Sequence, residues 1–211
     1  MRNLAPTKTN LLKIKDELKF ARLGYDLLDQ KRNILVLELL HIVDQCVDIQ
    51  DQAEKALERA YRTLEEAVLK MGKLKLTTLA SAVNIESEIK ITQRRVMGVQ
   101  LPVVETSFKE HPPYYSPMGT SFWIDSSLQN FKEALSVMGR LAELKISITR
   151  LARELRKTIR KVNALEKIAI PDLDESVSYI QNRLEETERD MFVLMKMVKT
   201  RLENKKEIEY E

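Results

Sequence analysis

The sequence predicts a mainly α-helical protein: a long antiparallel two-helix coiled coil formed by the N- and C-terminal helices, with a small β-hairpin or loop insert at the fold-back end. Three observations indicate this class. Apolar side chains recur at alternating steps of three and four residues over most of the chain. Only five glycines and six prolines occur in 211 residues, so helices have few places to end. Aromatic residues make up 6% and charged residues 32%, which is typical of a narrow aliphatic seam.

The first predicted segment, residues 1–71, is an N-terminal coiled-coil helix. Within this segment no proline follows Pro6. Thr7 or Thr9 is the expected N-cap. A spacing of about 3.5 residues keeps one face turned toward a partner helix. At about 1.5 Å per residue the helix would be roughly 95 Å long, so we expect an elongated chain. The apolar seam consists of Leu11, Ile14, Leu18, Ala21, Tyr25, Leu28, Arg32, Leu35, Leu39, Ile42, Cys46, Ile49, Ala53, Ala56 and Ala60.

Residues 72–125 form a partly β insert in this interpretation. Gly72 ends the first helix, and apolar and polar residues then alternate over 88–92 and 99–103, which predicts two short strands with a bend near Gly98. Because proline cannot donate a backbone hydrogen bond, Pro102 restricts its strand to an edge. Residues 111–119 are expected to form a loop.

The second predicted helix, residues 126–211, begins with a capping box of Ser126 and Gln129. Its seam reaches Ala169 and resumes at Leu173 after two successive steps of four residues. Such a phase shift next to Pro171 predicts a bend near Ile170 rather than a break. The seam consists of Ala134, Val137, Leu141, Leu144, Ile148, Leu151, Leu155, Thr158, Val162, Leu165, Ala169, Leu173, Val177, Ile180, Leu184, Thr187, Met191, Leu194 and Val198.

Folding back near the insert places residues whose numbers sum to about 197 opposite one another, so Thr9 faces Glu188. The last fifteen or so residues then extend beyond the partner helix. This extension is apolar on nearly all sides, which suggests a surrounding sleeve of another protein. The alternative is packing on its own chain. The apolar residues are Met191, Phe192, Val193, Leu194, Met195, Met197 and Val198.

Arg32 is the one charged residue in the first seam. The same register places it opposite Leu165 and Glu166. We expect Glu166 to neutralise it or Asn163 to accept a hydrogen bond from it, which would fix the coiled-coil register.

Apolar surface between Ile34 and Val43 exceeds what one partner helix covers. Val36, Leu40 and Val43 belong to a second row beside the seam, so we expect an additional covering element. We interpret His41 as structural and the lone Cys46 as a small core residue, which excludes an intramolecular disulfide.

Motifs for catalysis and ligand binding are absent. The sequence has no glycine-rich phosphate loop, no Ser-His-Asp set and no His-Cys metal cluster, so we expect no active site, cofactor or metal. The 35 basic and 32 acidic residues are interleaved, which disfavours nucleic-acid binding. The start lacks an apolar signal core and no run of eighteen apolar residues occurs, so we expect a cytoplasmic protein without direct membrane insertion.

The sequence resembles the D subunit of V-type and archaeal (A-type) rotary ATPases and ATP synthases over nearly its full length. The stretch from Val162 to Pro171 is specific to that family, and Val96 and Met97 look like its insert. Lys161 and Asn33 depart from it mildly, and residues 109–123 match little. Other matching residues are Pro6, Thr7, Leu11, Leu18, Ala21, Gly24, Leu27, Leu28, Lys31, Arg32, Gly98, Pro102, Arg160, Ile180, Leu184, Glu185, Glu188 and Arg189.

The resemblance implies a non-catalytic central-stalk rotor that couples ATP synthesis or hydrolysis in a ring of A and B subunits to proton or sodium transport. Both termini would lie inside the ring, and the insert end would face the F subunit and the C or d subunit of the membrane rotor. We expect the start of the first helix and Met191, Phe192, Leu194, Met195 and Val198 to contact the ring. We expect Val36, Leu40, Val43, Val96 and Met97 to contact F or the rotor side. A coiled-coil tether or scaffold and an RNA-binding helical arm are the alternatives.

Overall fold

A computed structural model describes residues 5–83, 86–109, 114–116 and 118–209, and side chains as far as residue 202. The predicted loop at 111–119 lies partly outside the described residues. The structure is mainly helical, as predicted, with a two-stranded antiparallel sheet. The chain divides into two compact units, residues 1–31 with 158–211 and residues 32–157, and each is described by itself.

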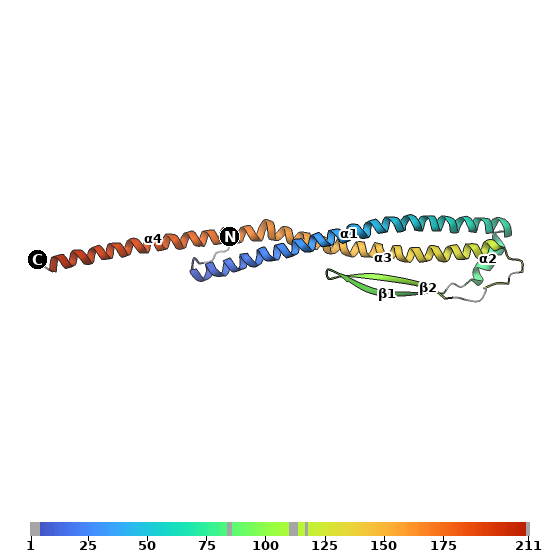
Figure 1. Cartoon of the computed structure of the whole chain (residues 1–211), viewed down its shortest axis with the longest axis horizontal. Coiled ribbons are helices and arrows are strands. Elements are labelled where there is room, and N and C mark those ends of the chain that lie inside the picture. The colour runs from blue at the N-terminus through green and yellow to red at the C-terminus, as the bar shows by residue number, and fades with distance from the viewer. Residues whose placement is uncertain (1–4, 84–85, 110–113, 117, 210–211) are drawn as a thin grey trace. The chain divides into compact units, whose positions relative to one another are not determined.

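In the first unit the beginning of helix α1 (Lys8–Met71) packs against α4 (Ile170–Glu209) (Figure 1). The predicted cap is confirmed at Thr7, whose hydroxyl accepts a hydrogen bond from the Asn10 backbone N–H at 3.3 Å. Apolar residues of both helices form one core, which contains Ile14, Leu18, Leu173 and Ile180. All four were predicted seam residues.

Two ion pairs define the helix register in this unit. Lys8 Nζ lies 2.8 Å from Glu188, and an Arg22 guanidinium nitrogen lies 2.9 Å from Asp174. Both pairs of residue numbers sum to 196. A constant sum means that the helices run antiparallel, and it agrees within one residue with the predicted value of about 197.

A π-helical turn, η1 (Leu165–Ala169), joins α3 (Phe122–Ala164) to α4. The Ile170 backbone N–H donates to the Leu165 carbonyl, five residues earlier, instead of the usual four. The turn lies just before Pro171, in the stretch where the apolar seam residues are separated by two successive steps of four residues. One extra residue per turn accommodates that phase shift, and the helix continues through the proline without a break.

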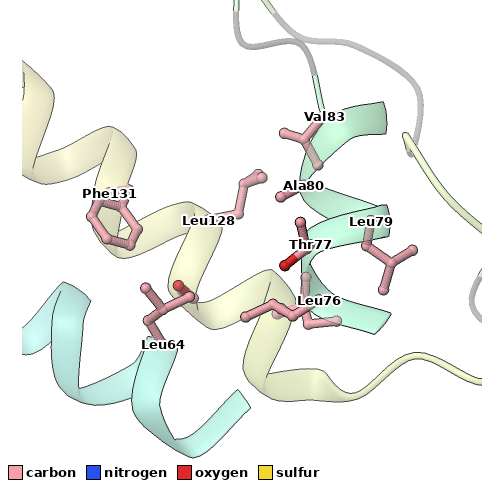
Figure 2. Close-up of a pocket in the computed structure, with 10 residues that line it drawn as sticks. Leu64, Leu76, Thr77, Leu79, Ala80, Val83, Leu128 and Phe131 are labelled. Atoms are coloured by element: carbon pink, nitrogen blue, oxygen red, sulfur yellow. The ribbon is translucent and has the colours of Figure 1, made fainter. Parts of the chain in front are cut away.

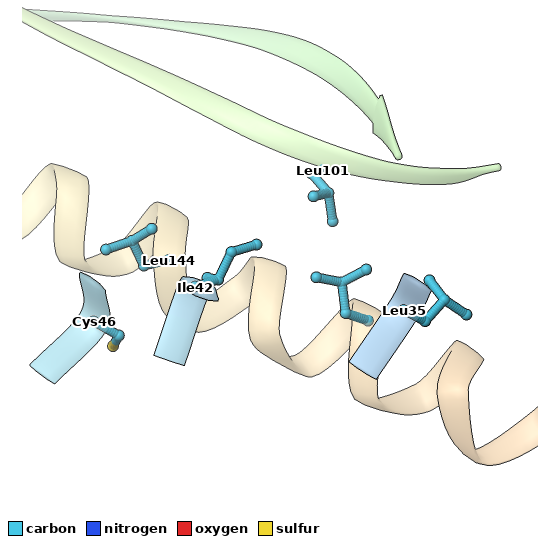
Figure 3. Packing of buried hydrophobic residues seen from close by; sticks show 6 residues of the cluster. Leu35, Ile42, Cys46, Leu101 and Leu144 are labelled. Atoms are coloured by element: carbon cyan, nitrogen blue, oxygen red, sulfur yellow. The ribbon is translucent and has the colours of Figure 1, made fainter. Parts of the chain in front are cut away.

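In the second unit the rest of α1 packs against α3. The core contains Leu35, Ile42 and Cys46 of α1 with Leu144 and Leu151 of α3 (Figure 3). Farther along, the Tyr61 and Phe131 rings meet edge to face at 5.6 Å between centroids.

The predicted capping box at Ser126 is wrong, because α3 begins at Phe122. Ser121 provides the cap instead: its hydroxyl accepts a hydrogen bond from the Trp123 N–H at 3.4 Å. Ser126 lies one turn inside the helix and is half-buried.

Between α1 and α3 the chain forms a short helix and a hairpin. Gly72, at φ 83°, separates α1 from α2 (Lys73–Ala82), a helix that the sequence interpretation missed. The predicted strands are confirmed as β1 (Ser87–Val96) and β2 (Val99–Phe108), paired antiparallel with Ile91 opposite Val104. Met97 and Gly98 both have positive φ, which is the geometry of a tight hairpin turn.

The hairpin packs along the helices of the second unit. Leu101 is 1% exposed and belongs to the core cluster with Leu35 and Ile42. The hairpin therefore adds to the core around the seam residues Leu35 and Ile42, whereas Leu40 of the predicted second row remains 55% exposed.

Three polar contacts orient the hairpin. Arg94 pairs with Glu38 of α1 at 3.3 Å. The Val104 N–H donates to the Glu143 carboxylate at 2.9 Å, and Arg150 donates to the Gln100 carbonyl at 2.9 Å. Because the last two bonds involve backbone groups of β2, they help fix its position on α3.

Candidate partner-binding surfaces

A continuous set of exposed apolar side chains lies on α4, which continues past the first turn of α1 (Figure 1). We call residues 191–198 the α4 apolar segment. Leu184 is the last α4 residue within the core, and the following residues are exposed as far as Leu202. Relative exposures lie between 49% and 68% for Met191, Phe192, Val193, Leu194, Met195, Met197, Val198 and Leu202.

The direction of these side chains determines what kind of surface would cover them. Successive helical residues are rotated by about 100°, so Met191 to Leu194 point to all sides of the helix. One flat surface would cover only one of those sides. The arrangement therefore favours a partner that encloses the helix.

The Lys8–Glu188 ion pair marks the point where α1 stops covering α4. Its hydrogen bond, followed by charge attraction, raises the pKa of Lys8 and lowers the pKa of Glu188. Both groups are well exposed to solvent, so the pair indicates register more than stability. The α4 apolar segment begins three residues beyond it.

Sequence reasoning did not single out a second exposed row on α1 in the first unit. Phe20, Leu23 and Leu27 are 77%, 57% and 58% exposed. Steps of three and four residues place them on one face, about 200° away from the seam residues Leu18 and Ala21. We call these three residues the α1 outer row. Their spacing of three and four residues could have been recognised in the sequence.

The residues predicted to contact F or the rotor side differ in exposure. Val36, Val43 and Val96 are half-buried, and Val96 packs against the core cluster. Leu40 and Met97 remain 55% and 40% exposed. Because the hairpin uses Val96 for docking, Leu40 and Met97 are the members of this set most available to a partner.

The register prediction for Arg32 stays a prediction. Its guanidinium donates to the Asn33 side-chain oxygen at 3.4 Å. Asn163 and Glu166 are exposed, and Glu166 lies in the π-helical turn.

A pocket of about 510 Å³, which sequence reasoning also missed, lies between the end of α1, α2 and the start of α3 (Figure 2). Its polar side chains are two hydroxyls, Thr77 and Ser127. The apolar lining consists of Leu64, Leu76, Leu79, Ala80, Val83, Ile124, Leu128 and Phe131. Such a lining suits an apolar side chain of a partner better than a charged ligand.

The described part of the chain contains neither a metal-binding cluster nor a membrane-spanning helix. Among residues that the structure describes, no three His, Cys, Asp or Glu side chains are placed to hold a metal ion. In the described ranges, no helix is both long enough and apolar enough to span a membrane.

Comparison with known proteins identifies the family of this chain. A family model described as that of the ATP synthase D subunit matches residues 10–200. This chain belongs to the ATP synthase D subunit family. The D subunit of the A-type ATP synthase of Thermococcus sibiricus is 37% identical over 203 residues, covering 95% of each chain.

D subunits of both A-type and V-type ATP synthases are similar to this chain. The D subunit of the A-type ATP synthase of Pyrococcus horikoshii is 35% identical over 203 residues, covering 95% of each chain. The D subunit of the V-type ATP synthase of Thermotoga neapolitana is 34% identical over 200 residues, covering 95% of this chain and 98% of the bacterial one. Coverage of this extent means that the similarity includes both long helices and the hairpin.

Proposed function

We propose that this chain is the central-stalk rotor of a V/A-type ATP synthase or ATPase. It would turn inside a ring of A and B subunits and connect that ring to ion transport in the membrane. The α4 apolar segment supports this role most directly, because its side chains point to all sides of the helix and need an enclosing partner. Family membership supports the proposal because the relatives that this chain matches are subunits of ATP synthases.

The proposed contribution to ATP chemistry is mechanical. Nucleotide binding and catalysis would belong to the A and B subunits, and this chain would be non-catalytic. Its two helices differ in sequence, so each of three equivalent A/B pairs would meet a different face. Differential contacts of this kind favour different conformations, and rotation would change the affinities of the three pairs in order.

The insert end of the chain would connect to the remaining stalk. We place the F subunit and the C or d subunit at that end. Leu40, Met97 and the pocket beside Leu76 are the contact candidates there. In this arrangement the protein is cytoplasmic and peripheral to the membrane.

A truncation tests the rotor proposal. The chain ending at Asp190 lacks the α4 apolar segment but retains every core residue of the first unit. We expect it to fold, as measured by circular dichroism, and to lose coupling between ATP hydrolysis and ion pumping in the reconstituted complex. Full ATP-driven pumping with the truncated chain would contradict the proposal.

A coiled-coil tether or scaffold is the alternative function. It needs binding at fixed sites but no rotation. A covalent cross-link that joins this chain to one protein of the A/B ring separates the two proposals. A rotor locked in this way stops ATP turnover, whereas a static tether does not.

A further inference from the structure

The pocket between the end of α1, α2 and the start of α3 has room for a hydrocarbon chain (Figure 2). Its volume is about 510 Å³, and every lining residue belongs to the second unit. Eight of the ten lining side chains are hydrocarbon, and Ile124 among them is buried. An engineered cavity of about 150 Å³ with a lining of leucine, isoleucine and phenylalanine binds benzene. This pocket can therefore hold a longer apolar group.

The polar groups at the pocket are not placed to hold an ion inside it. The Thr77 hydroxyl donates to the Lys73 carbonyl at 2.9 Å within α2. Ser127 is buried. Asp125, the acidic residue in the first turn of α3, is outside the lining and accepts a hydrogen bond from the Tyr115 hydroxyl at 2.6 Å. An ion in the pocket would lose its hydration without gaining a charged partner, so the interior favours an apolar group.

Helix α2 forms one wall of the pocket, although none of its residues is buried. Leu76 and Leu79 are half-buried beside the pocket, as is Val83 just after the helix. A hydrocarbon in the pocket would remove more of their apolar surface from water, which is favourable. An occupant should therefore stabilise the position of α2.

Positive charge without a counter-charge lies at the same end of the unit. Residues 67–85, which include the end of α1 and all of α2, contain three lysines and no acidic residue. These lysines, Lys70, Lys73 and Lys75, are exposed. Throughout the described ranges, their ammonium groups form neither an ion pair nor a hydrogen bond. An anionic group is the ligand chemistry that complements them.

Helical geometry places two of these lysines next to the lining. Lys73 precedes Leu76 and Thr77 by three and four residues, so all three lie on one face of α2. Lys75 precedes Leu79 by four residues, which places these two side chains on one face in the same way. A group that extends out of the pocket along α2 would therefore meet an ammonium group.

We propose that this pocket binds a single-chain fatty acid. The hydrocarbon chain would lie against Leu64, Leu76 and Leu128, and the carboxylate would lie outside the lining beside Lys73 and Lys75. A neutral hydrocarbon would leave the lysines without a counter-charge, and a small anion would leave the apolar lining uncovered. A fatty acid satisfies both. The inference does not rest on the proposed rotor role.

Titration of the full chain with laurate, below its critical micelle concentration, tests the site. Calorimetry should show one saturable site. NMR shift changes should be centred on α2 and the start of α3, and hydrogen exchange should slow at the Leu76 amide, which donates to the Gly72 carbonyl at 3.3 Å. Dodecyltrimethylammonium has a chain of the same length and the opposite charge. It should bind about tenfold or more weakly because the lysines repel it.

Two phenylalanine substitutions on α2 test the location of the chain. Ala80 is exposed and lines the pocket, so A80F places a ring where the hydrocarbon would lie and should abolish laurate binding. Thr78 is exposed and outside the lining, so T78F is the matched control and should bind laurate like the wild type. Circular dichroism checks that both variants are folded.

A second pair of variants tests the head group and does not alter the lining. K73Q/K75Q should raise the dissociation constant for laurate by about fivefold. K13Q/K19Q removes the same charge from exposed positions in the first unit and should change it little. This comparison keeps the inference testable if A80F does not fold.

The inference fails if laurate does not saturate one site, if the cationic amphiphile binds equally well, or if folded A80F binds laurate like the wild type. NMR shift changes confined to the α4 apolar segment would also overturn it, because they would indicate general affinity for exposed apolar side chains. If laurate does not bind and A80F instead weakens binding of the C or d subunit, the pocket holds a protein side chain and not a fatty acid.

Discussion

Arg22 and Asp174 are 152 residues apart in the sequence and are joined by two hydrogen bonds of 3.0 and 2.9 Å. With the Lys8–Glu188 pair they define the antiparallel register of the first unit. Their side chains are 57% and 48% exposed, so the energetic effect is modest. We expect R22D and D174R each to destabilise the fold and the double variant R22D/D174R to recover most of the loss.

A double-mutant cycle by chemical denaturation measures this pair. The coupling free energy should be about 0.2–1 kcal/mol and should fall at high salt. A zero coupling free energy at low salt would mean that the pair does not determine the register.

Leu35 and Leu40 provide a matched comparison of buried and exposed leucines on one helix. Leu35 is 0% exposed in the hairpin-covered core, and Leu40 is 55% exposed. L35A should reduce the free energy of unfolding by about 2–5 kcal/mol because it leaves a cavity. L40A should reduce it by less than about 1 kcal/mol. Similar losses for the two variants in a urea titration would contradict the packing of this core.

Gly139 allows β2 to approach α3 closely. A Cβ added there would lie 2.6 Å from the Thr106 hydroxyl oxygen. G139A should therefore displace the hairpin and increase hydrogen exchange at the Val104 amide, which donates to Glu143.

The same substitution should have the opposite sign in a T106A background. There the clash is removed, and alanine exceeds glycine in helix propensity by about 1 kcal/mol. G139A/T106A should thus be more stable than T106A alone. If G139A has the same effect in both backgrounds, Thr106 is not the limiting contact.

Glu188 should titrate at a lower pH than an isolated glutamate because of Lys8. A carboxylate with a lowered pKa stabilises the fold above its unfolded pKa, and that contribution disappears as pH falls through the folded value. Lys8, with a raised pKa, loses its contribution as pH rises through the folded value. NMR titration should show the Glu188 pKa moving back upward in K8Q, with K13Q as the control. An unchanged pKa in K8Q would refute the pairing.

The coiled coil was predictable from sequence because its determinants are periodic. Apolar residues spaced by three and four positions predicted that Ile14 and Leu18 lie near Leu173 and Ile180. The predicted pairing of the two helices agrees within one residue with the Lys8–Glu188 contact. The change of rhythm at Pro171 located the π-helical turn, although not its type.

Features that depend on tertiary contacts were not predictable in the same way. Docking of Leu101 against Leu35 and Ile42 joins segments with no shared periodicity. The true start of α3 at Phe122 depends on a cap by Ser121, whereas Ser126 satisfied the same local pattern. For the candidate site, the α4 apolar segment followed from composition, but the pocket beside α2 required a helix that the sequence interpretation missed.

Photo-crosslinking from position 192 tests the central claim most directly. Phe192 is 68% exposed on the α4 apolar segment, and a photoreactive phenylalanine analogue there should disturb the fold little. In the assembled complex we expect it to cross-link to A or B subunits, at equivalent residues in all three A/B pairs after turnover with ATP. Cross-links confined to this chain itself, or to one A/B pair regardless of turnover, would contradict a rotor enclosed by the ring.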